Sequence, residues 1–249
     1  MDLFSKGVET TLAMLTRVQR ENDRRPHASG VALARLREIP LVARQSRAER
    51  LAPLREKVAI CQRCPHLVSF RSQTVFGVGN PDAELMFIGE APGADEDRQG
   101  EPFVGRAGQL LTRIIGAMGF GREEVYIANV LKCRPDMPKG ASGNRPPTAE
   151  EMATCLPYLT EQIEIIEPKV LVALGGTAVE GLLGRREPIG RMRRRWHSYG
   201  ETPLMITFHP SYLLRNQSNT EKRKVWEDML LVLERLERPI SEKQRNYFR

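Results

Sequence analysis

The chain has 249 residues, of which 41% are hydrophobic and 28% are charged, a composition typical of a globular protein that buries a core. Its 38 Lys and Arg residues exceed its 31 Asp and Glu residues by seven, which makes a polyanionic partner plausible. No apolar run is long enough to span a membrane, the first residues lack the order of a secretion signal, and four cysteines are too few for a secreted disulfide scaffold. We therefore expect a cytoplasmic protein with reduced thiols and no membrane contact.

Residues 1–50 are predicted to form a basic N-terminal extension outside the main domain. Apolar residues recur at helical spacing over residues 3–20, which predicts an amphipathic helix, and an arginine-rich segment broken by two prolines follows as a flexible arm. Ten Lys and Arg residues against six Asp and Glu residues give this region a net charge of +4. Two interpretations stay open: a tether to another protein, and an arm that tracks along DNA.

Residues 51–237 alternate apolar runs with amphipathic helical patterns. Near-continuous apolar runs at 84–90, 125–132, 169–175 and 203–209 are typical of buried parallel strands. Helical patterns lie at 106–118, 148–166 and 220–237, the second of which begins with a capping box of Thr148 and Glu151. The pattern predicts an α/β fold, a three-layer α/β/α sandwich with a central four-stranded parallel sheet. Residues 238–249 form a short basic tail that we expect to fray.

Polar residues and glycines follow the predicted strands at their carboxyl ends, where ligands bind in such sheets. The segment 89–93 follows the first strand, Asn129 lies at the end of the second and His209 at the end of the fourth, and Phe103 lies between the first two strands. Each has a structural alternative, since a lone histidine or asparagine after a strand is commonly a cap or a satisfied core group. Their predicted convergence at one edge of the sheet makes them candidate site residues.

The cysteines form a second signal, Cys61-x2-Cys64 followed by Cys133 and Cys155. Four buried structural thiols are one interpretation, because free cysteine is among the most buried residue types. Four thiolates are also the ligand set of a zinc ion or an iron–sulfur cluster. A redox pair is disfavoured because Cys61 and Cys64 precede every predicted strand. The spacing favours a metal site and does not separate zinc from iron.

Four segments together resemble the family 4 uracil-DNA glycosylases: 89–93, 100–111, 129–135 and 209–213. The resemblance covers about residues 55–237, within the predicted glycosylase domain of 51–237, and leaves the N-terminal extension outside. It implies a four-stranded parallel sheet and a 4Fe-4S cluster held by Cys61, Cys64, Cys133 and Cys155. It also implies a DNA repair enzyme that flips uracil out of DNA and hydrolyses its N-glycosidic bond, leaving an abasic site.

The resemblance assigns roles to individual residues. His209 would donate a hydrogen bond to uracil O2 as that oxygen becomes anionic. Asn129 would accept from uracil N3–H and donate to O4, which cytosine cannot match. Phe103 would stack on the base, and Gly89 and Gly93 would let the backbone approach the ligand.

Two acidic residues after the first strand are further candidates for roles in the site. Glu90 is the candidate for orienting the attacking water or stabilising the oxocarbenium ion. In some relatives the water-activating acid lies one position later, where this chain has Ala91 in the substrate loop. Glu96 is a candidate for excluding the thymine methyl group, and the rest of the acidic segment 94–101 is expected to be a solvated loop.

DNA contacts are expected from the loops after the last strand and from an arginine cluster at 185–195. Ser211 is expected to contact a phosphate, Leu213 to fill the space of the flipped base, and Arg215 to bind DNA. The cluster carries a net charge of +5, and Arg193, Arg194 and Arg195 are its predicted phosphate contacts. The partner is uracil-containing DNA, single- or double-stranded, bound by a monomer near the nucleoid, with a repair or replication protein as a candidate partner of the extension.

Three alternatives are weaker than the glycosylase interpretation. A relative that captures the abasic sugar through a histidine beside Cys133 is disfavoured, because residues 134–154 contain no histidine. A DNA-binding domain without chemistry is disfavoured by the presence of Glu90, Asn129 and His209. A zinc-binding nucleotide module would lack the brown colour of an iron–sulfur protein. The cluster itself is expected to be structural, because none of its ligands overlaps the uracil contacts.

Overall fold

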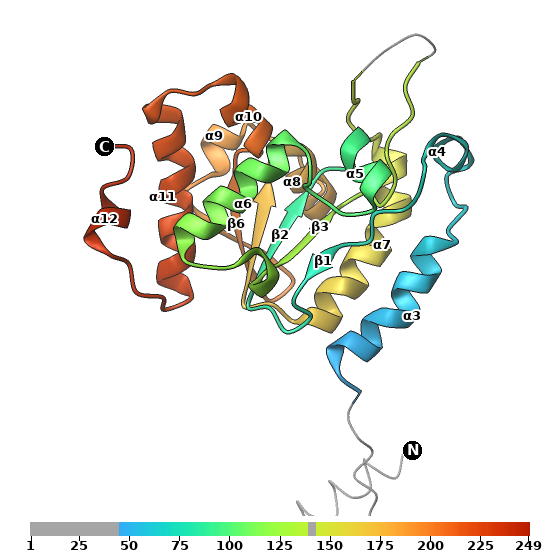
Figure 1. Ribbon diagram of the computed structural model, residues 1–249, viewed down its shortest axis with the longest axis horizontal. Coiled ribbons are helices and arrows are strands. Elements are labelled where there is room, and N and C mark those ends of the chain that lie inside the picture. Colours follow the sequence, from blue (N-terminus) through green and yellow to red (C-terminus); the bar gives the residue numbers. More distant parts are fainter. Residues whose placement is uncertain (1–44, 139–142) are drawn as a thin grey trace, which may run out of the picture. The chain divides into compact units, whose positions relative to one another are not determined.

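The computed structural model describes residues 45–138 and 143–249, so the helix predicted over 3–20 and the arm after it lie outside the described residues. A six-stranded sheet with the order β1-β3-β2-β4-β6-β5 forms its centre (Figure 1). The strands are β1 (Val78–Gly79), β2 (Leu85–Gly89), β3 (Tyr126–Asn129), β4 (Val170–Leu174), β5 (Trp196–Tyr199) and β6 (Thr202–Thr207).

The four central strands confirm the predicted parallel sheet. Strands β3, β2, β4 and β6 pair in parallel, and β2, β3 and β4 are buried along their whole length. The prediction of four strands was incomplete, because β1 and β5 add antiparallel edges. Strand β1 has only two residues, and β5 alternates exposed with half-buried side chains before a turn at Gly200. Neither has the apolar run that marks a buried strand.

Ten α-helices are described, and the three predicted from periodicity end within two residues of their expected bounds. The helices are α3 (Arg47–Ala59), α4 (Pro65–Phe70), α5 (Ala94–Gln99), α6 (Arg106–Met118), α7 (Ala149–Ile166), α8 (Gly176–Leu183), α9 (Ile189–Met192), α10 (Pro210–Arg215), α11 (Asn219–Arg235) and α12 (Glu242–Arg245). The capping box of Thr148 and Glu151 begins α7 as predicted. Helix α3 begins at Arg47, inside the segment assigned to the extension. In the described part of the chain, no helix has the length and apolar character needed to cross a membrane.

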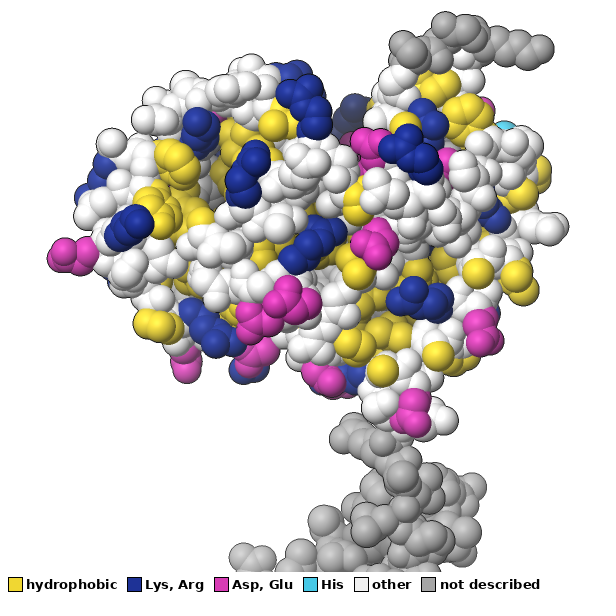
Figure 2. All heavy atoms as spheres, viewed as in Figure 1, with side chains coloured by type: hydrophobic (Ala, Val, Ile, Leu, Met, Phe, Trp, Pro, Cys, Tyr) yellow, Lys and Arg dark blue, Asp and Glu magenta, His cyan; other side chains and the backbone are white. Residues whose placement is uncertain are grey.

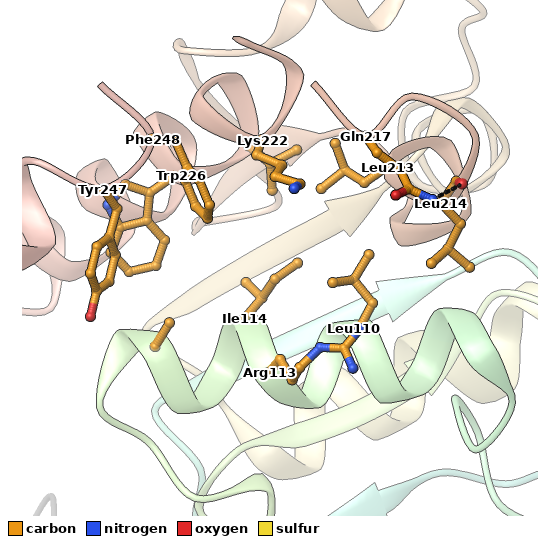
Figure 3. Close-up of a pocket in the computed structure, with 12 residues that line it drawn as sticks. Leu110, Arg113, Ile114, Leu213, Leu214, Gln217, Lys222, Trp226, Tyr247 and Phe248 are labelled. Atoms are coloured by element: carbon orange, nitrogen blue, oxygen red, sulfur yellow. Dashed lines mark hydrogen bonds between the residues drawn. The ribbon is translucent and has the colours of Figure 1, made fainter. Parts of the chain in front are cut away.

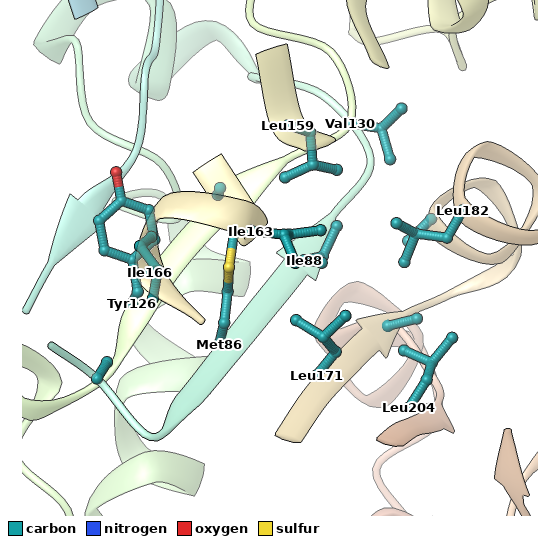
Figure 4. Packing of buried hydrophobic residues seen from close by; sticks show 14 of the residues in the cluster. Met86, Ile88, Tyr126, Val130, Leu159, Ile163, Ile166, Leu171, Leu182 and Leu204 are labelled. Atoms are coloured by element: carbon teal, nitrogen blue, oxygen red, sulfur yellow. The ribbon is translucent and has the colours of Figure 1, made fainter. Parts of the chain in front are cut away.

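Helices cover both faces of the sheet and complete the three layers. Helices α6 and α11 pack on one face, against side chains such as Phe87 and Ile127. Helices α7 and α8 pack on the other face, against Met86, Ile88 and Leu171 (Figure 4). Both faces of the central strands are therefore buried, and the loops at their carboxyl ends are left to form a site.

The C-terminal tail is ordered against the domain, so the expectation that it frays was wrong. The indole Nε1 of Trp226 donates to the carbonyl of Gln244 at 2.6 Å, and Gln244 Nε2 donates to the carbonyl of Ala117 at 2.9 Å. The ring of Tyr247 lies 5.1 Å from that of Trp226. These contacts fix α12 and the last residues beside α6 and α11. The basic composition of the tail gives no sign of the aromatic contacts that hold it.

Candidate active site and cysteine centre

Gly89, Phe103 and Asn129 meet where β2 and β3 end. Gly89 pairs with Asn129 across the two parallel strands. A Cβ atom on Gly89 would lie 2.4 Å from Phe103 Cζ and 2.5 Å from Asn129 Oδ1, so only glycine fits between the ring and the amide. Asn129 is 2% exposed and its Oδ1 has no hydrogen-bond partner. Because an unpaired buried acceptor costs about 1–3 kcal/mol, this oxygen is suited to a ligand that brings a donor.

The loop of Phe103 is held in an uncommon conformation. Phe103 has a φ of 56° and is 7% exposed. A Cβ atom on Gly108 would lie 1.8 Å from the Phe103 carbonyl oxygen, so the first turn of α6 packs directly on this loop. The Phe103 ring lies 5.6 Å from the imidazole of His209, with 32° between their planes. The aromatic ring, the amide and the imidazole predicted as site residues are therefore brought together.

His209 is the N-cap of α10, directly after β6. The Ser211 backbone N–H donates to His209 Nδ1 at 3.2 Å, and the Ser211 hydroxyl lies 2.8 Å from the same nitrogen. Burial, reinforced by the charge of Arg215, lowers the pKa of His209 to about 4. The ring is therefore neutral near pH 7 with its proton on Nε2, where it can donate. Ser211, predicted to contact a phosphate, orients this imidazole.

Glu96 holds two loops of the site through its carboxylate. Its oxygens accept from the backbone N–H groups of Gly93 at 3.1 Å, Val104 at 3.0 Å and Gly105 at 2.9 Å. A Cβ atom on Gly93 would lie 2.7 Å from Glu96 Oε2, so this glycine makes room for the carboxylate. The structure thus gives Glu96 a positioning role on either side of Phe103, where the sequence suggested contact with the base.

Glu90 and Ala91 follow Gly89 and face different surroundings. Glu90 is half-buried, and among the described residues no hydrogen bond or ion pair engages its carboxylate, although its carbonyl accepts from the Leu131 N–H at 3.0 Å. Ala91 packs against the cluster that contains Leu131, Cys133 and Cys155. Ala91 therefore contacts the cysteine region, where the sequence had placed it among the substrate contacts.

The four cysteines gather beside this loop. Cys133 and Cys155 are each 7% exposed, Cys61 and Cys64 are half-buried, and all four are free thiols. Burial raises the pKa of Cys64, Cys133 and Cys155, the last to about 12, and the charge of Cys61 adds to each of these shifts. Cys64 packs against the cluster that contains Cys133 and Cys155, and Arg71 bonds to both Cys133 and the backbone of Cys61, so the four cysteines lie in one region.

Donors surround the sulfur atoms. Arg71 donates from one guanidinium nitrogen to Cys133 Sγ at 2.9 Å and from the other to the Cys61 carbonyl at 2.7 Å. The Lys132 backbone N–H lies 3.2 Å from Cys155 Sγ. N–H groups directed at sulfur stabilise thiolates, so the donors fit a set of metal-bound cysteines.

A second group of ligand-type residues lies beside α7. Among the described residues, His66, Asp136 and Glu151 form the one group of three whose donor atoms lie within 4.8 Å of one another. The Arg145 guanidinium already pairs with Asp136 and, at 2.6 Å, with Glu151. Burial raises the pKa of Glu151, but its hydrogen bonds with Arg145, Thr148 and His66 have the larger, opposite effect. The pKa is therefore lowered to about 2. This ion-pair network fixes the start of the helix that carries Cys155.

A further link joins the cysteine region to the loop of Phe103, and sequence reasoning missed it. The Ser72 N–H, next to Arg71, donates to both carboxylate oxygens of Asp97 at 2.9 and 3.0 Å. Asp97 is 4% exposed on α5, one residue after Glu96. The expectation of a solvated loop at 94–101 was therefore wrong. The charged composition of 94–101 predicted a loop, but most of the segment forms helix α5, in which Asp97 is buried.

The residues predicted to bind DNA are divided between surface and interior. Arg194, Arg195 and Arg215 are exposed. Arg193 exposes 9% of its side chain and pairs at 3.1 Å with Asp228, which also accepts from the Thr207 hydroxyl. Leu213 is 5% exposed. The structure thus gives Arg193 a packing role in place of phosphate contact, and it buries Leu213 where a wedge would need to project.

Comparison with known proteins agrees with this geometry. The sequence profile of the uracil DNA glycosylase superfamily matches residues 76–230. The Type-4 uracil-DNA glycosylase of Thermotoga maritima is 46% identical over 74% of this chain and 93% of its own length, and that of Archaeoglobus fulgidus is 48% identical over 72% and 93%. The Type-5 uracil-DNA glycosylase of Thermus thermophilus is 27% identical over 71% of the chain and 91% of its own length. The chain belongs to the uracil DNA glycosylase superfamily and, within it, to the type-4 family.

Proposed function

We propose that this protein is a uracil-DNA glycosylase that flips uracil out of DNA and hydrolyses the N-glycosidic bond, leaving an abasic site for base excision repair. The observation that carries the proposal is the unpaired, buried Oδ1 of Asn129 beside the space left by Gly89. Uracil N3–H supplies the missing donor, and the Asn129 amide group donates to O4 in return. Cytosine has no proton on N3, so it would leave the same oxygen unpaired.

The leaving group is stabilised by His209. As the glycosidic bond breaks, negative charge collects on uracil O2, and the neutral imidazole donates to it through Nε2–H. Because burial lowers the pKa of His209 to about 4, the ring needs no proton exchange before it acts. A fixed donor of this kind acts most strongly where water is excluded. The Phe103 ring beside it supports the flipped base by stacking.

The proposed role of Glu90 is at the deoxyribose of the flipped nucleotide. Its carboxylate follows Gly89, and no hydrogen bond or ion pair with the described residues neutralises it. A free carboxylate at this position stabilises the positive charge that develops on the sugar, and it orients the water that attacks the anomeric carbon. The proposed role is mainly electrostatic, because the adjacent Ala91 supplies no second acid.

The four cysteines fit a 4Fe-4S cluster better than a single zinc ion. Zinc–sulfur bonds of about 2.3 Å would bring the sulfurs within roughly 3.8 Å of one another. Among the described residues, however, no three cysteine sulfurs lie within 4.8 Å of each other. When bound, the cluster would cross-link the segment before the sheet, the end of β3 and helix α7. It takes no part in the hydrolysis that we propose.

DNA is the substrate, in single- or double-stranded form, and Arg194, Arg195 and Arg215 are the proposed phosphate contacts. The enzyme would act as a monomer on chromosomal DNA in the cytoplasm. Residues 1–50 would serve as an arm toward DNA or toward a repair or replication protein.

The proposal is tested by uracil release from single- and double-stranded oligonucleotides that carry uracil, thymine, hypoxanthine or cytosine. We expect release of uracil, and a loss of about a hundredfold or more in kcat/KM for Asn129→Leu, which removes the amide at similar volume. Asn216→Leu, at the exposed asparagine that caps the C-terminus of α10, is the matched control. The absence of uracil release by the unmodified, iron-loaded protein would overturn the proposal.

A further inference from the structure

A groove of about 590 Å³ lies away from the uracil site, between α6, α10, α11 and the C-terminal tail (Figure 3). Its walls are mostly leucine, isoleucine and aromatic side chains. In Figure 3, Leu110 and Ile114 of α6 point toward Leu213 on the opposite side, with the rings of Trp226, Tyr247 and Phe248 at the far end. The proposed uracil chemistry uses none of these rings.

Aromatic faces and unpaired cations occur together in this groove. Phe248 is 41% exposed, and its ring follows those of Tyr247 at 6.1 Å and Trp226 beyond it. Lys222 Nζ lies 5.9 Å from the centre of the Phe248 ring. No aspartate or glutamate lines the groove, and among the described residues neither Lys222 nor Arg113 is paired with an acid. A groove with stacking surfaces and free positive charge is the arrangement that proteins use for unpaired nucleic acid.

Helix α10 connects the groove with the proposed uracil site, although the two are separate. Leu213 and Leu214 line one end of it, and the N-cap of the same six-residue helix is His209. On the proposed function, a DNA strand that delivers a base to His209 would place its neighbouring nucleotides near this end of the groove. In Figure 2, basic and hydrophobic side chains are interspersed with other atoms in the upper left part of the face seen there.

We propose that this groove binds an unpaired nucleotide of the DNA strand that flanks the uracil, with its base against Phe248 and its phosphate near Arg113 and Lys222. The inference rests on the proposed function and adds a preference for single-stranded substrate, because a base stacked in a duplex does not expose its face. Charge complementarity favours DNA over two other occupants. Residues 1–50 carry a net charge of +4 and a second copy of the chain carries +7, so both would meet a cationic rim.

The test compares Phe248→Ala and Phe248→Trp, together with Lys222→Gln and Lys243→Gln. Phe248→Ala removes the stacking surface, whereas Phe248→Trp keeps one. Lys243 is an exposed lysine of α12 outside the groove, so Lys243→Gln is the control for lost charge. We expect Phe248→Ala to lower kcat/KM on long single-stranded uracil oligonucleotides about tenfold. It should leave duplexes and the shortest cleavable oligonucleotide unchanged. Phe248→Trp should retain activity, and Lys222→Gln should lose more than Lys243→Gln.

Direct binding is read from 2-aminopurine placed at each position on either side of the uracil. Its fluorescence should be quenched at one flanking position by the unmodified protein and not by Phe248→Ala. Equal losses on every substrate, no loss at all, or conversion of a dimer to a monomer by Phe248→Ala would overturn the inference. These outcomes leave uracil release by the unmodified protein intact, so they are distinct from a failure of the proposed function.

Discussion

Two polar side chains of the site, Asn129 and His209, differ in how their hydrogen-bonding capacity is used. Ser211 occupies Nδ1 of His209, so only the Nε2–H donor is left for a ligand. Nothing in the described protein occupies Oδ1 of Asn129. His209 therefore presents a single donor and Asn129 a free acceptor, and both lie near the Phe103 ring. In the proposed function, this pairing would match the O2 acceptor and the N3–H donor of uracil and would set the direction of the base.

The first prediction concerns the pH dependence of His209. Because burial lowers its pKa from 6.5 to about 4, we expect kcat/KM for uracil release to show no inflection near 6.5 from this group and to fall as pH approaches 4. Arg215→Gln removes the second cause of the shift, so the acidic limb should move to higher pH. The measurement is a pH–rate profile on a short oligonucleotide. A histidine limb centred near 6.5 in the unmodified enzyme would contradict it.

The same shift has a consequence for stability. The unfolded chain takes up a proton on His209 below about 6.5, and the folded protein does not until about 4. The free energy of unfolding contributed by this group is therefore complete above pH 6.5 and declines as pH falls toward 4. His209→Gln should flatten that part of the curve.

Individual residues show what sequence could and could not supply. The positions of Asn129, Phe103 and His209 follow strands or flank them, so topology alone predicts their convergence. The roles of Glu96 and Ser211 depend on distances of about 3 Å across loops, and no spacing in the chain contains that information. Leu213 and Arg193 were predicted at the surface, because a sequence motif or a run of charges does not indicate whether a given side chain is buried.

At the scale of elements, hydrogen bonds join the segment of Arg71 and Ser72, helix α5 and the loop of Phe103, all of which precede α6. Arg71 bonds to the cysteine region, Ser72 bonds to Asp97, and the neighbouring Glu96 holds the backbone on both sides of Phe103. Helix α5 lies between the cysteine region and the loop of Phe103. We therefore expect disorder at the cysteines to affect the loop that would hold the base.

The second prediction tests this support with Asp97→Ala. The change removes the charged acceptor of the Ser72 N–H, a buried carboxylate, so we expect the free energy of unfolding to fall by about 2 kcal/mol. The loop of Phe103 should loosen, which raises KM for uracil DNA with a smaller change in kcat. Asp95→Ala, on the same helix but paired with Arg98 at the surface, is the control.

Chemical denaturation and steady-state kinetics measure the two effects of Asp97→Ala. If Asp97→Ala and Asp95→Ala behaved alike in both experiments, the coupling through α5 would be refuted. Iron content, read from absorbance near 400 nm, shows whether the cysteine centre is kept in each variant.

The elements that sequence missed have a common physical cause. The central strands were predicted because burial on both faces requires near-continuous apolar residues. Strands β1 and β5 lie at the edges, so their sequences need only extended backbone and one partner. Helix α12 has four residues, and its position is fixed by Trp226 on another helix. Long-range contacts of this kind leave no local pattern.

At the scale of the whole molecule, the positive charge is partly internal. The arginine cluster at 185–195 carries a net charge of +5, but Arg193 neutralises Asp228 inside the domain and Arg194 lies 3.7 Å from Glu227. Burial raises the pKa of Asp228 to about 6 against the opposing effect of Thr207 and Arg193, so this acid depends on its partners. The charge that can reach a phosphate is therefore smaller than the composition suggests.

The third prediction separates these two uses of arginine. Each lost contact with a phosphate reduces the slope of log affinity against log salt by roughly 0.7 to 0.9. We expect Arg194→Gln with Arg195→Gln to weaken uracil-DNA binding and to flatten that slope by up to twice this amount, with little change in stability. Arg193→Gln should instead leave the slope unchanged and lower the free energy of unfolding by about 3 kcal/mol, because it strands Asp228 in the interior.

The loss for Arg193→Gln should depend on pH, and the sign follows from Asp228. Below about 6 this acid is protonated in the folded protein and needs no cation, so the variant should lose little. Above that pH the carboxylate is ionised and buried without its guanidinium, and the loss should grow. Urea unfolding at pH 5 and 8, with salt titrations of DNA binding, measures both halves. A smaller slope of log affinity against log salt in Arg193→Gln would show that Arg193 contacts DNA. An arginine that stays inside the domain releases no counterions from DNA.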